Sequence, residues 1–338
     1  MKIDKISEFE LIDRIKANTI NSEGVIKGIG DDAAVLEATV GTNILFCSDM
    51  LIEGRHFLRD VITPRELGYK ALAVNLSDIA SMGGKPKYAL LSTGWPKDLE
   101  IVYIQEFYEG VKGIAQQFHV SIVGGDTVNS NDIVIDVAVI GEVEYNKAIM
   151  RSGAKPGHVL AATGTLGDSA TGLAEITQEL KKSPPDHIQE YLRKRHMMPE
   201  PRVEAGQLLA RLGASSMIDI SDGLASEINH ICAQSDVSAE VIEEAIPISE
   251  EARAFASLNK IDVLELALFG GEDYELLFTV PEERWQAVKE VVGGNLNLNI
   301  TQIGKIIPKV NDENKVCIIN KEGQSRLIKA KGYNHFRS

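Results

Sequence analysis

Six short acidic signatures, each beside glycine or serine, carry the side chains of this chain that could do chemistry. They are GDD at 30–32, SD at 48–49, LSD at 76–78, GGD at 124–126, DISDG at 219–223 and GGED at 270–273. Any one of them alone is typical of a turn. Carboxylates gathered in one cleft would repel one another unless cations joined them. Because aspartate oxygens suit Mg²⁺, which also binds substrate phosphates, the set indicates a metal-bridged polyphosphate.

The common nucleotide-binding motifs do not explain such a site. The sequence Gly83-Gly84-Lys85-Pro86 lacks the leading glycine and the Ser or Thr of a Walker A loop. Gly28 and Gly30 lack the third glycine of a dinucleotide loop, and the protein-kinase signatures HRD and DFG are missing. Arg151 and Lys155 could supply positive charge, although a solvated linker charge is an equally good interpretation of Arg151.

Cysteine and histidine residues each allow two interpretations. Cys47 has no evident activating base, which favours a buried thiol over a nucleophile. His56 could be a surface or core residue as easily as a substrate contact. The three cysteines, Cys47, Cys232 and Cys317, form neither a disulfide framework nor a zinc spacing, so we expect a reducing compartment.

Composition narrows the class of protein. The chain has 338 residues, 44% of them hydrophobic and 25% charged, as expected for a globular protein of two domains. Its 49 acidic and 35 basic residues give a formal charge of −14, which argues against nucleic acid as a partner. The N-terminus lacks the apolar core of a signal peptide and no apolar run could span a bilayer, so we expect a cytoplasmic protein without a membrane partner.

The stretch 63–86 predicts the helix that must position one of these carboxylates. Thr63 and Glu66 form a capping box, and two glycines followed by a proline end the helix after about five turns. Apolar residues on several sides predict that it is buried. Asn75 and Asp78 nevertheless share one face at its centre. Asp78 therefore emerges into water, pairs with an arginine or holds a metal ion.

Hydrophobic periodicity predicts the other elements and a domain boundary. A helix at 7–17 capped by Ser7 comes first. Four strands (43–47, about 87–93, 120–123 and 133–139) and two helices (from Thr63, and 98–118) then form one domain. The first of these strands should stop at Ser48-Asp49, and 120–123 should run into the GGD signature. The turn-rich RSGAKPG at 151–157 marks the joint, so we predict domains at 1–147 and 148–338.

The second domain begins with a strand at 158–162 and a glycine-rich loop that leads into a helix. The charged, proline-bearing segment KKSPPDHIQEYLRKRHMMPEPR is expected to be a solvated excursion. Helix 203–212, strand 217–220 and a helix through Cys232 follow, and further strands are expected at 274–280, near Ile303 and at 316–319.

Taken in order, GIGDDAA, SDMLIEGRHF, YKALAVNLSDIASMGG, GGDT, RSGAKPG, TGTLGDSATGL, DISDGL, GGEDYEL and GYNHF resemble the thiamine-monophosphate kinase family of the AIR-synthase-like (PurM-like) superfamily. The match runs from residue 28 to residue 336. It implies an α+β fold of two domains, with an N-terminal sheet that pairs with a second subunit's sheet in a homodimer and a C-terminal α/β domain. ATP and several Mg²⁺ ions would sit in the cleft between the domains. The implied reaction converts thiamine monophosphate to thiamine diphosphate, the last step of its biosynthesis.

The resemblance also implies roles for individual residues. The implied metal ligands are Asp32, Cys47, Ser48, Asp49, Asp78, Asp126, Asp219 and Asp222, with Cys47 and Ser48 acting through a backbone oxygen or hydroxyl. The implied ATP contacts are Gly125, Asp126, Arg151, Ser221 and Tyr108, and the implied substrate contacts are His56, Glu272 and Tyr333. An acidic group and an aromatic face suit the thiazolium cation of the substrate. Two residues depart from the family pattern: Asn334 replaces an expected Asp, and Cys47 stands where Ser is usual.

The acceptor predicts the mechanism. A phosphate oxygen of thiamine monophosphate is already ionised at pH 7, so no general base is needed. Mg²⁺ would offset the repulsion between the two anions and align an in-line displacement. We therefore expect direct transfer, with no catalytic nucleophile or base and no phospho-enzyme.

Several alternatives share parts of this pattern. AIR synthetase, selenophosphate synthetase and the hydrogenase-maturation dehydratase use ATP and similar acidic motifs. No Cys and Lys pair of the selenophosphate type precedes GIGDD, and the C-terminal HFRS lacks the terminal Cys of the dehydratase. A different class of hypothesis is a non-catalytic, metal-binding dimer. The presence of every acidic signature together with Arg151 argues against it.

Overall fold

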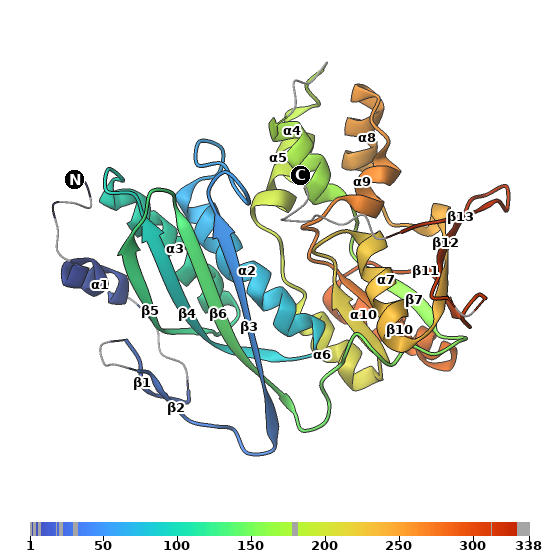
Figure 1. Ribbon diagram of the computed structural model, residues 1–338, viewed down its shortest axis with the longest axis horizontal. Coiled ribbons are helices and arrows are strands. Elements are labelled where there is room, and N and C mark those ends of the chain that lie inside the picture. The colour runs from blue at the N-terminus through green and yellow to red at the C-terminus, as the bar shows by residue number, and fades with distance from the viewer. Residues whose placement is uncertain are drawn as a thin grey trace. The chain divides into compact units, whose positions relative to one another are not determined.

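The computed structural model describes residues 2, 5, 8–17, 19, 23–29, 33–177, 182–311 and 313–329. The chain divides into two compact units, Met1–Ile79 with Gly84–Asn146 and Ala80–Gly83 with Lys147–Ser338. Each unit has its own sheet (Figure 1). Among the described residues, no helix combines the length and the apolar character that a membrane crossing needs. The predicted cap Ser7 lies outside the described residues, next to helix α1 (Glu8–Lys16).

A four-stranded sheet forms the centre of the first unit. Its order is β3 (Thr42–Ile52), β6 (Val134–Glu144), β4 (Lys85–Trp95) and β5 (Ser121–Asn129). Only the β4–β5 pair is parallel within this sheet. The short strands β1 (Val25–Lys27) and β2 (Val35–Leu36) form a separate pair. The four predicted strands are therefore present, and they belong to one sheet.

The predicted ends of two strands are wrong. Ser48 and Asp49 lie inside β3, because β3 pairs with β6 without interruption from Thr42 to Ile52. The signature at 124–126 lies inside β5, which pairs with β4 as far as Asn129. Asp49 and Asp126 therefore project from strands that continue past them, since main-chain pairing with a neighbour decides where a strand ends.

Helix α2 (Pro64–Ser81) begins and ends as predicted. The N–H of Thr63 donates to Glu66 Oε2 at 2.9 Å, and the N–H of Glu66 donates to Thr63 Oγ1 at 3.3 Å, which is the reciprocal pattern of a capping box. Gly83 takes a φ of 72°, and the N–H of Gly84 donates to the carbonyl of Ile79 at 3.0 Å. These bonds satisfy some of the main-chain groups that both helix ends would otherwise leave without partners.

Helix α2 and helix α3 (Ile101–Gln117) cover one face of the sheet (Figure 1) and pack against each other through glycines. A Cβ atom on Gly68 would lie 1.9 Å from the carbonyl oxygen of Phe107. A Cβ atom on Gly110 would lie 1.9 Å from the carbonyl oxygen of Arg65. The two backbones therefore approach too closely for any side chain at these positions, and this contact holds the helix that carries Asp78.

Gly110→Ala should lower the free energy of unfolding by about 1–3 kcal/mol, because the new methyl group forces α2 and α3 apart. Gly113 provides a matched control in the same helix, since a Cβ there would meet nothing within 4 Å. Gly113→Ala should be neutral or stabilising by up to about 1 kcal/mol. Urea unfolding followed by circular dichroism measures both changes, and equal effects of the two substitutions would contradict the packing argument.

A seven-stranded sheet forms the centre of the second unit. Its order is β13 (Ser325–Leu327), β12 (Val316–Ile319), β9 (Ser238–Ile242), β11 (Ile300–Ile307), β7 (Val159–Thr163), β10 (Leu276–Val280) and β8 (Ser216–Asp219). Within this sheet only β9 and β12 pair in parallel. Strands β7 and β10 are buried along their whole length, so the sheet is covered on both faces at its centre.

The helices of this unit are α4 (Asp168–Thr177), α5 (Asp186–Met197), α6 (Val203–Leu212), α7 (Leu224–Ser235), α8 (Glu250–Asn259), α9 (Val263–Phe269) and α10 (Glu282–Leu296), with a 3-10 turn η2 (Glu243–Ala245). Helix α7 lies against β8, β9, β10 and β12, whereas α10 lies against α6 and β11. The prediction of helix 203–212 is confirmed, and the sequence reading missed α8, α10, β9 and β13.

The prediction that the charged segment after α4 is a solvated excursion is wrong. The segment contains α5, which buries Leu192, His196 and Met197. Arg195 of the same helix donates to Glu275 Oε1 at 2.9 Å, and that carboxylate is fully buried. Arg195 therefore faces inward toward its partner, which a charge count along the sequence does not reveal.

Candidate active site

Asn75 joins helix α2 to strand β3 in the first unit. Its buried side chain accepts a hydrogen bond from the N–H of Asp49 at 3.0 Å and donates to the carbonyl of Ala71 at 3.1 Å. The thiol of Cys47 donates to the main-chain carbonyl of Asn75 at 3.5 Å. Asp78 follows Asn75 by three residues and so shares its face of the helix. The structure thus places Asp78 on the face of α2 that is anchored to Cys47 and Asp49.

Ser48 points away from these residues. Its hydroxyl donates to Asp136 Oδ1 at 2.8 Å, and both residues belong to the outer face of the sheet. Successive side chains of a strand alternate between the two faces, whereas Cys47 and Asp49 face α2. Only the main chain of Ser48 is therefore suited to the predicted metal contact.

Asp126 lies on β5, at the opposite edge of the sheet from β3. Three strand spacings separate the two edges, which is about 14 Å. A Mg²⁺ ion binds oxygen at about 2.1 Å, so a single ion cannot be shared by Asp49 and Asp126. This separation requires more than one ion if both residues are ligands, as the sequence predicts.

Gly125 and Tyr108 support Asp126 in different ways. A Cβ atom on Gly125 would lie 1.9 Å from the carbonyl oxygen of Leu91, so this position requires glycine. Tyr108 is buried, and burial raises the pKa of its phenol to about 12 although a hydrogen bond with Thr93 acts in the other direction. The Thr93 hydroxyl donates to the main-chain carbonyl of Asp126 at 3.3 Å. The nucleotide contact of Tyr108 stays a prediction.

His56 lies in the turn after β3. Its Nδ1 accepts a hydrogen bond from the N–H of Ile52 at 3.0 Å, which fixes the ring next to the end of the strand. Three residues singled out from the sequence, namely Asp32, Tyr333 and Asn334, lie outside the described residues.

Two carboxylates lie together in the second unit. Asp219 ends β8 and is buried, and Glu227 of α7 is buried beside it. Burial, and next the negative charge of Asp219, raise the pKa of Glu227 to about 8, while the positive charge of Arg151 lowers it. Glu227 Oε1 accepts a hydrogen bond from the N–H of Asp222 at 3.2 Å. Sequence reasoning missed Glu227, although a carboxylate within the apolar pattern of a helix is the same signal that identified Asp78.

The loop at 270–275 brings Glu272 next to Ser221. The N–H of Glu272 donates to the carbonyl of Ser221 at 2.7 Å, and the N–H of Tyr274 donates to the carbonyl of Ile220 at 2.9 Å. Glu272 and Tyr274 have φ values of 67° and 51°. Non-glycine residues rarely adopt this left-handed conformation, and where they do they concentrate at functional sites.

Buried polar groups hold this loop in place. Asp273 accepts hydrogen bonds from the N–H groups of Gly167 at 2.6 Å and Ser169 at 3.1 Å, at the start of α4. His196 Nδ1 lies 3.0 Å from Ser169 Oγ and 3.3 Å from Glu272 Oε2. The carboxylate of Glu272 is therefore oriented by a histidine from α5.

The donor set fits Mg²⁺ in its chemistry. It consists of aspartate oxygens, which this hard cation prefers, and the crowding of negative charge at Glu227 is a condition that a cation relieves. Within the described ranges, no group of three or more His, Cys, Asp or Glu side chains is arranged to hold a metal. Asp219 and Asp222 both lie close enough to Glu227 to raise its pKa, whereas Asp78 lies near Asp49 only in that Asn75, three residues away on the same helix, binds the N–H of Asp49.

Two family models match the chain. AIR synthase related protein, N-terminal domain, matches residues 30–143, and AIR synthase related protein, C-terminal domain, matches residues 155–316. The fold and the site thus define a two-domain AIR-synthase-related protein of the α+β, PurM-like class, as the sequence predicted.

Individual relatives narrow this class. The thiamine-monophosphate kinase of Bacillus subtilis is 41% identical over 333 residues, which cover 98% of this chain and 100% of that protein. That of Escherichia coli K12 is 38% identical and covers 97% of this chain and 98% of the relative. The chain belongs to the thiamine-monophosphate kinase family, and the resemblance read from the sequence is confirmed.

Solved structures agree with this assignment. The thiamine-monophosphate kinase from Stenotrophomonas maltophilia has a TM-score of 0.82 at 33% identity and covers 96% of this chain and 98% of that one. AaThiL complexed with AMPPCP and TMP has a TM-score of 0.76 at 36% identity, with 99% of both chains covered. The hydrogenase maturation protein HypE, at 20% identity and a TM-score of 0.76, shares the fold alone.

Proposed function

We propose that this protein catalyses the ATP-dependent phosphorylation of thiamine monophosphate to thiamine diphosphate. The observation that carries the proposal is the 41% identity to a thiamine-monophosphate kinase over 98% of the chain. The complex of a relative with AMPPCP, an ATP analogue, and TMP supports ATP and thiamine monophosphate as the two substrates. No disulfide joins Cys47, Cys232 and Cys317, which all lie in the described part of the chain, and this supports a cytoplasmic location.

The proposed metal ligands are Asp32, Cys47, Ser48, Asp49, Asp78, Asp126, Asp219 and Asp222. When bound there, Mg²⁺ would offset the repulsion between the two phosphate groups. Gly125, Asp126, Arg151, Ser221 and Tyr108 are the proposed ATP contacts, and His56, Glu272 and Tyr333 the proposed contacts of thiamine monophosphate. His196 would orient Glu272 toward the cationic thiazolium, since it lies 3.3 Å from that carboxylate.

The proposed transfer needs no base and no nucleophile from the protein. The acceptor phosphate is already ionised at neutral pH, so the side chains bind and orient the reactants. We propose direct transfer from ATP to the acceptor, without a phosphorylated enzyme.

A product assay tests the proposed reaction. Purified protein is incubated with Mg²⁺ and ATP and offered thiamine monophosphate or thiamine, and the products are separated. We expect thiamine diphosphate and ADP from thiamine monophosphate, and no diphosphate from thiamine. If ADP formed only with another acceptor, a different enzyme of the superfamily would be indicated. Absence of all turnover would favour the non-catalytic, metal-binding alternative, and trapping of a labelled phospho-protein at a competent rate would exclude direct transfer.

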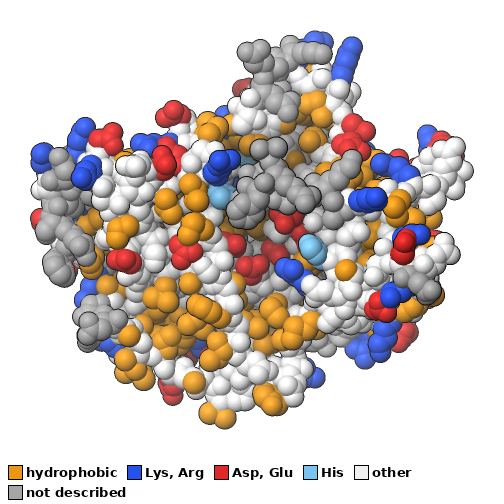
Figure 2. Space-filling view, viewed as in Figure 1, with side chains coloured by type: hydrophobic (Ala, Val, Ile, Leu, Met, Phe, Trp, Pro, Cys, Tyr) orange, Lys and Arg blue, Asp and Glu red, His pale blue; other side chains and the backbone are white. Residues whose placement is uncertain are grey.

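We also propose that two copies of the chain associate through the sheet of the first unit. Three hydrophobic side chains of β3 are exposed on the face away from α2, Ile44 and Phe46 at 67% each and Met50 at 49%. Figure 2 shows hydrophobic side chains gathered over this sheet. A contiguous exposed apolar patch is a common sign of a protein interface. The family resemblance supports a second copy of the same sheet as its partner.

Phe46→Glu should convert the dimer to a monomer, because it places a charge in the centre of the buried interface. Sedimentation velocity measures the mass in solution. Val102→Glu is the matched control, since Val102 is 59% exposed on α3 and lies outside the sheet. The wild type and this control should sediment as dimers. A monomeric wild type, or a Phe46→Glu variant that remains dimeric, would reject the interface.

A further inference from the structure

A cavity of about 730 Å³ lies wholly within the second unit. One wall comes from α5 and includes Tyr191, Lys194 and Arg195. The opposite wall comes from α10 and the loop after it, and includes Lys289 and Asn299. Pockets of 300–1,000 Å³ are typical of sites for small organic ligands. Its residues are separate from those proposed above for ATP, thiamine monophosphate and Mg²⁺.

The cavity has more basic than acidic side chains. Four basic residues line it, namely Lys194, Arg195, Arg202 and Lys289, against two acidic residues, Glu200 and Glu275. Arg202 donates to both carboxylates, at 2.9 Å to Glu200 and at 2.7 and 2.8 Å to Glu275. Both carboxylates are thus already neutralised by arginine. This surplus of positive charge stands out in a chain whose formal charge is −14.

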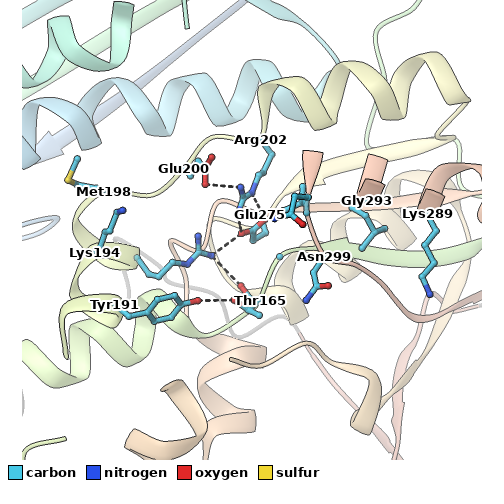
Figure 3. A pocket seen from close by; sticks show the side chains of 15 residues that line it. Thr165, Tyr191, Lys194, Met198, Glu200, Arg202, Glu275, Lys289, Gly293 and Asn299 are labelled. Carbon is cyan, nitrogen blue, oxygen red and sulfur yellow. Dashed lines mark hydrogen bonds and ion pairs between the residues drawn. The ribbon is translucent and has the colours of Figure 1, made fainter. Parts of the chain in front are cut away.

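The two lysines supply the uncompensated charge. Both are exposed, and neither forms an ion pair with another residue in the part of the chain that the structure describes. Figure 3 shows Lys194 and Lys289 at opposite ends of the lining, with Arg202 and Glu275 between them. An ammonium group on a flexible stem is a common ligand of phosphate. The site therefore offers a cationic group at each end.

The rest of the lining suits an organic group. Met198, Leu298 and Ile300 contribute apolar surface, and the side-chain amide of Asn299 contributes a donor and an acceptor. Tyr191 donates its hydroxyl to Asp168 at 2.8 Å, which fixes its ring at the cavity wall. A few fixed polar groups within a partly apolar lining are the usual composition of a small-molecule site.

We propose that this cavity binds a small organic phosphate, with its phosphate on Lys194 or Lys289 and its organic part against Tyr191 and the apolar lining. This organic phosphate is either a reactant of the enzyme or another phosphorylated metabolite, since both carry the same phosphate group. Such a site would be a second phosphate-binding position, one that does not require a metal.

Isothermal titration in EDTA tests the proposal, because chelation removes Mg²⁺ from the proposed reaction site. The probes are AMP, thiamine monophosphate, thiamine diphosphate and inorganic phosphate. The pocket variant is Lys194→Gln/Lys289→Gln, and Lys305→Gln/Lys321→Gln is a control with the same loss of charge at lysines outside the cavity. Thermal denaturation checks that all three proteins are equally folded.

We expect at least one organic phosphate to bind the wild type more tightly than inorganic phosphate does, and to bind the pocket variant at least tenfold more weakly. The control should bind like the wild type. The single lysine variants then show which end takes the phosphate, and the probe that binds distinguishes a reactant from another metabolite. No binding by any organic phosphate, equal binding by the pocket variant, or inorganic phosphate binding as tightly as every organic probe would overturn the proposal.

Discussion

Asp78→Asn should lower the rate of thiamine diphosphate formation by at least about 10²-fold, the loss expected when a group that stabilises transition-state charge is removed. Asparagine has the shape of aspartate, so the packing of α2 is kept. It removes the negative charge that makes the side chain a good ligand of Mg²⁺. The fold should persist, because α2 is held by its caps and by the contact of Gly68 and Gly110 with neighbouring backbone.

The measurement is the steady-state rate across a range of Mg²⁺ concentrations, with circular dichroism to confirm the fold. Asp132→Asn is the control, since Asp132 is an exposed carboxylate between β5 and β6 in the same unit. It should leave the rate unchanged. Near-normal turnover of Asp78→Asn at ordinary Mg²⁺ would show that Asp78 is not a metal ligand. The remaining interpretations would then be a carboxylate that is exposed to water or paired with an arginine.

Glu275→Gln should lower the free energy of unfolding by about 3–5 kcal/mol, the loss expected when one partner of a buried ion pair is removed. Glu275 is fully buried and accepts hydrogen bonds from Arg195, from Arg202 and, at 2.6 Å, from the hydroxyl of Thr163. Glutamine cannot balance two guanidinium groups, so Arg195 would keep only Asp168, at 3.5 Å, and Arg202 only the exposed Glu200 as charge partners. Urea unfolding of the purified protein measures the loss.

Glu200 offers a matched control because it also accepts a hydrogen bond from Arg202, at 2.9 Å, but its side chain is 59% exposed. Glu200→Gln should change stability by less than about 1 kcal/mol, since water screens an exposed pair. If both variants lost a similar amount of unfolding free energy, burial would not determine how strongly these carboxylates stabilise the protein through Arg202.

At acidic pH, the wild type and Glu275→Gln should have the same free energy of unfolding. Burial alone would raise the pKa of Glu275, but Arg202 and then Arg195 outweigh it and hold the pKa at about 2, against an ordinary value of 4.5. Because the pKa is lowered in the folded state, the stabilisation is present above pH 4.5 and is lost as the pH falls toward 2. Stability measured between pH 6 and pH 2 should therefore converge for the two proteins. A constant difference would contradict the lowered pKa.

Helix α2 could be predicted because the residues that begin and end it are close together in the sequence. Features that depend on contacts between distant residues could not be predicted. The capping box and terminal glycines of α2 lie within a few residues of the helix ends, so the sequence alone contains the signals. The end of β3 depends on its pairing with β6, about 90 residues away. The side chain of Arg195 on α5 is largely buried because Glu275, 80 residues further along the chain, lies across from it. The acidic signatures could be recognised for the same reason, because each one consists of a few consecutive residues. Glu227 carried the same local signal as Asp78, a carboxylate within the apolar pattern of a helix, but its nearness to Asp219 is set by the packing of α7 and could not be read from the sequence.

The left-handed conformation of Glu272 lowers the stability of the fold, while its carboxylate is proposed to serve activity. Its φ of 67° costs on the order of 1 kcal/mol for a residue with a Cβ atom, and glycine would adopt it freely. Selection for thermal stability alone would therefore favour glycine at this position and would discard the carboxylate. Glycine substitution at residues with positive φ is one way to stabilise this enzyme, but position 272 should be left as glutamate. The substitution there would remove the carboxylate that is proposed to bind the substrate.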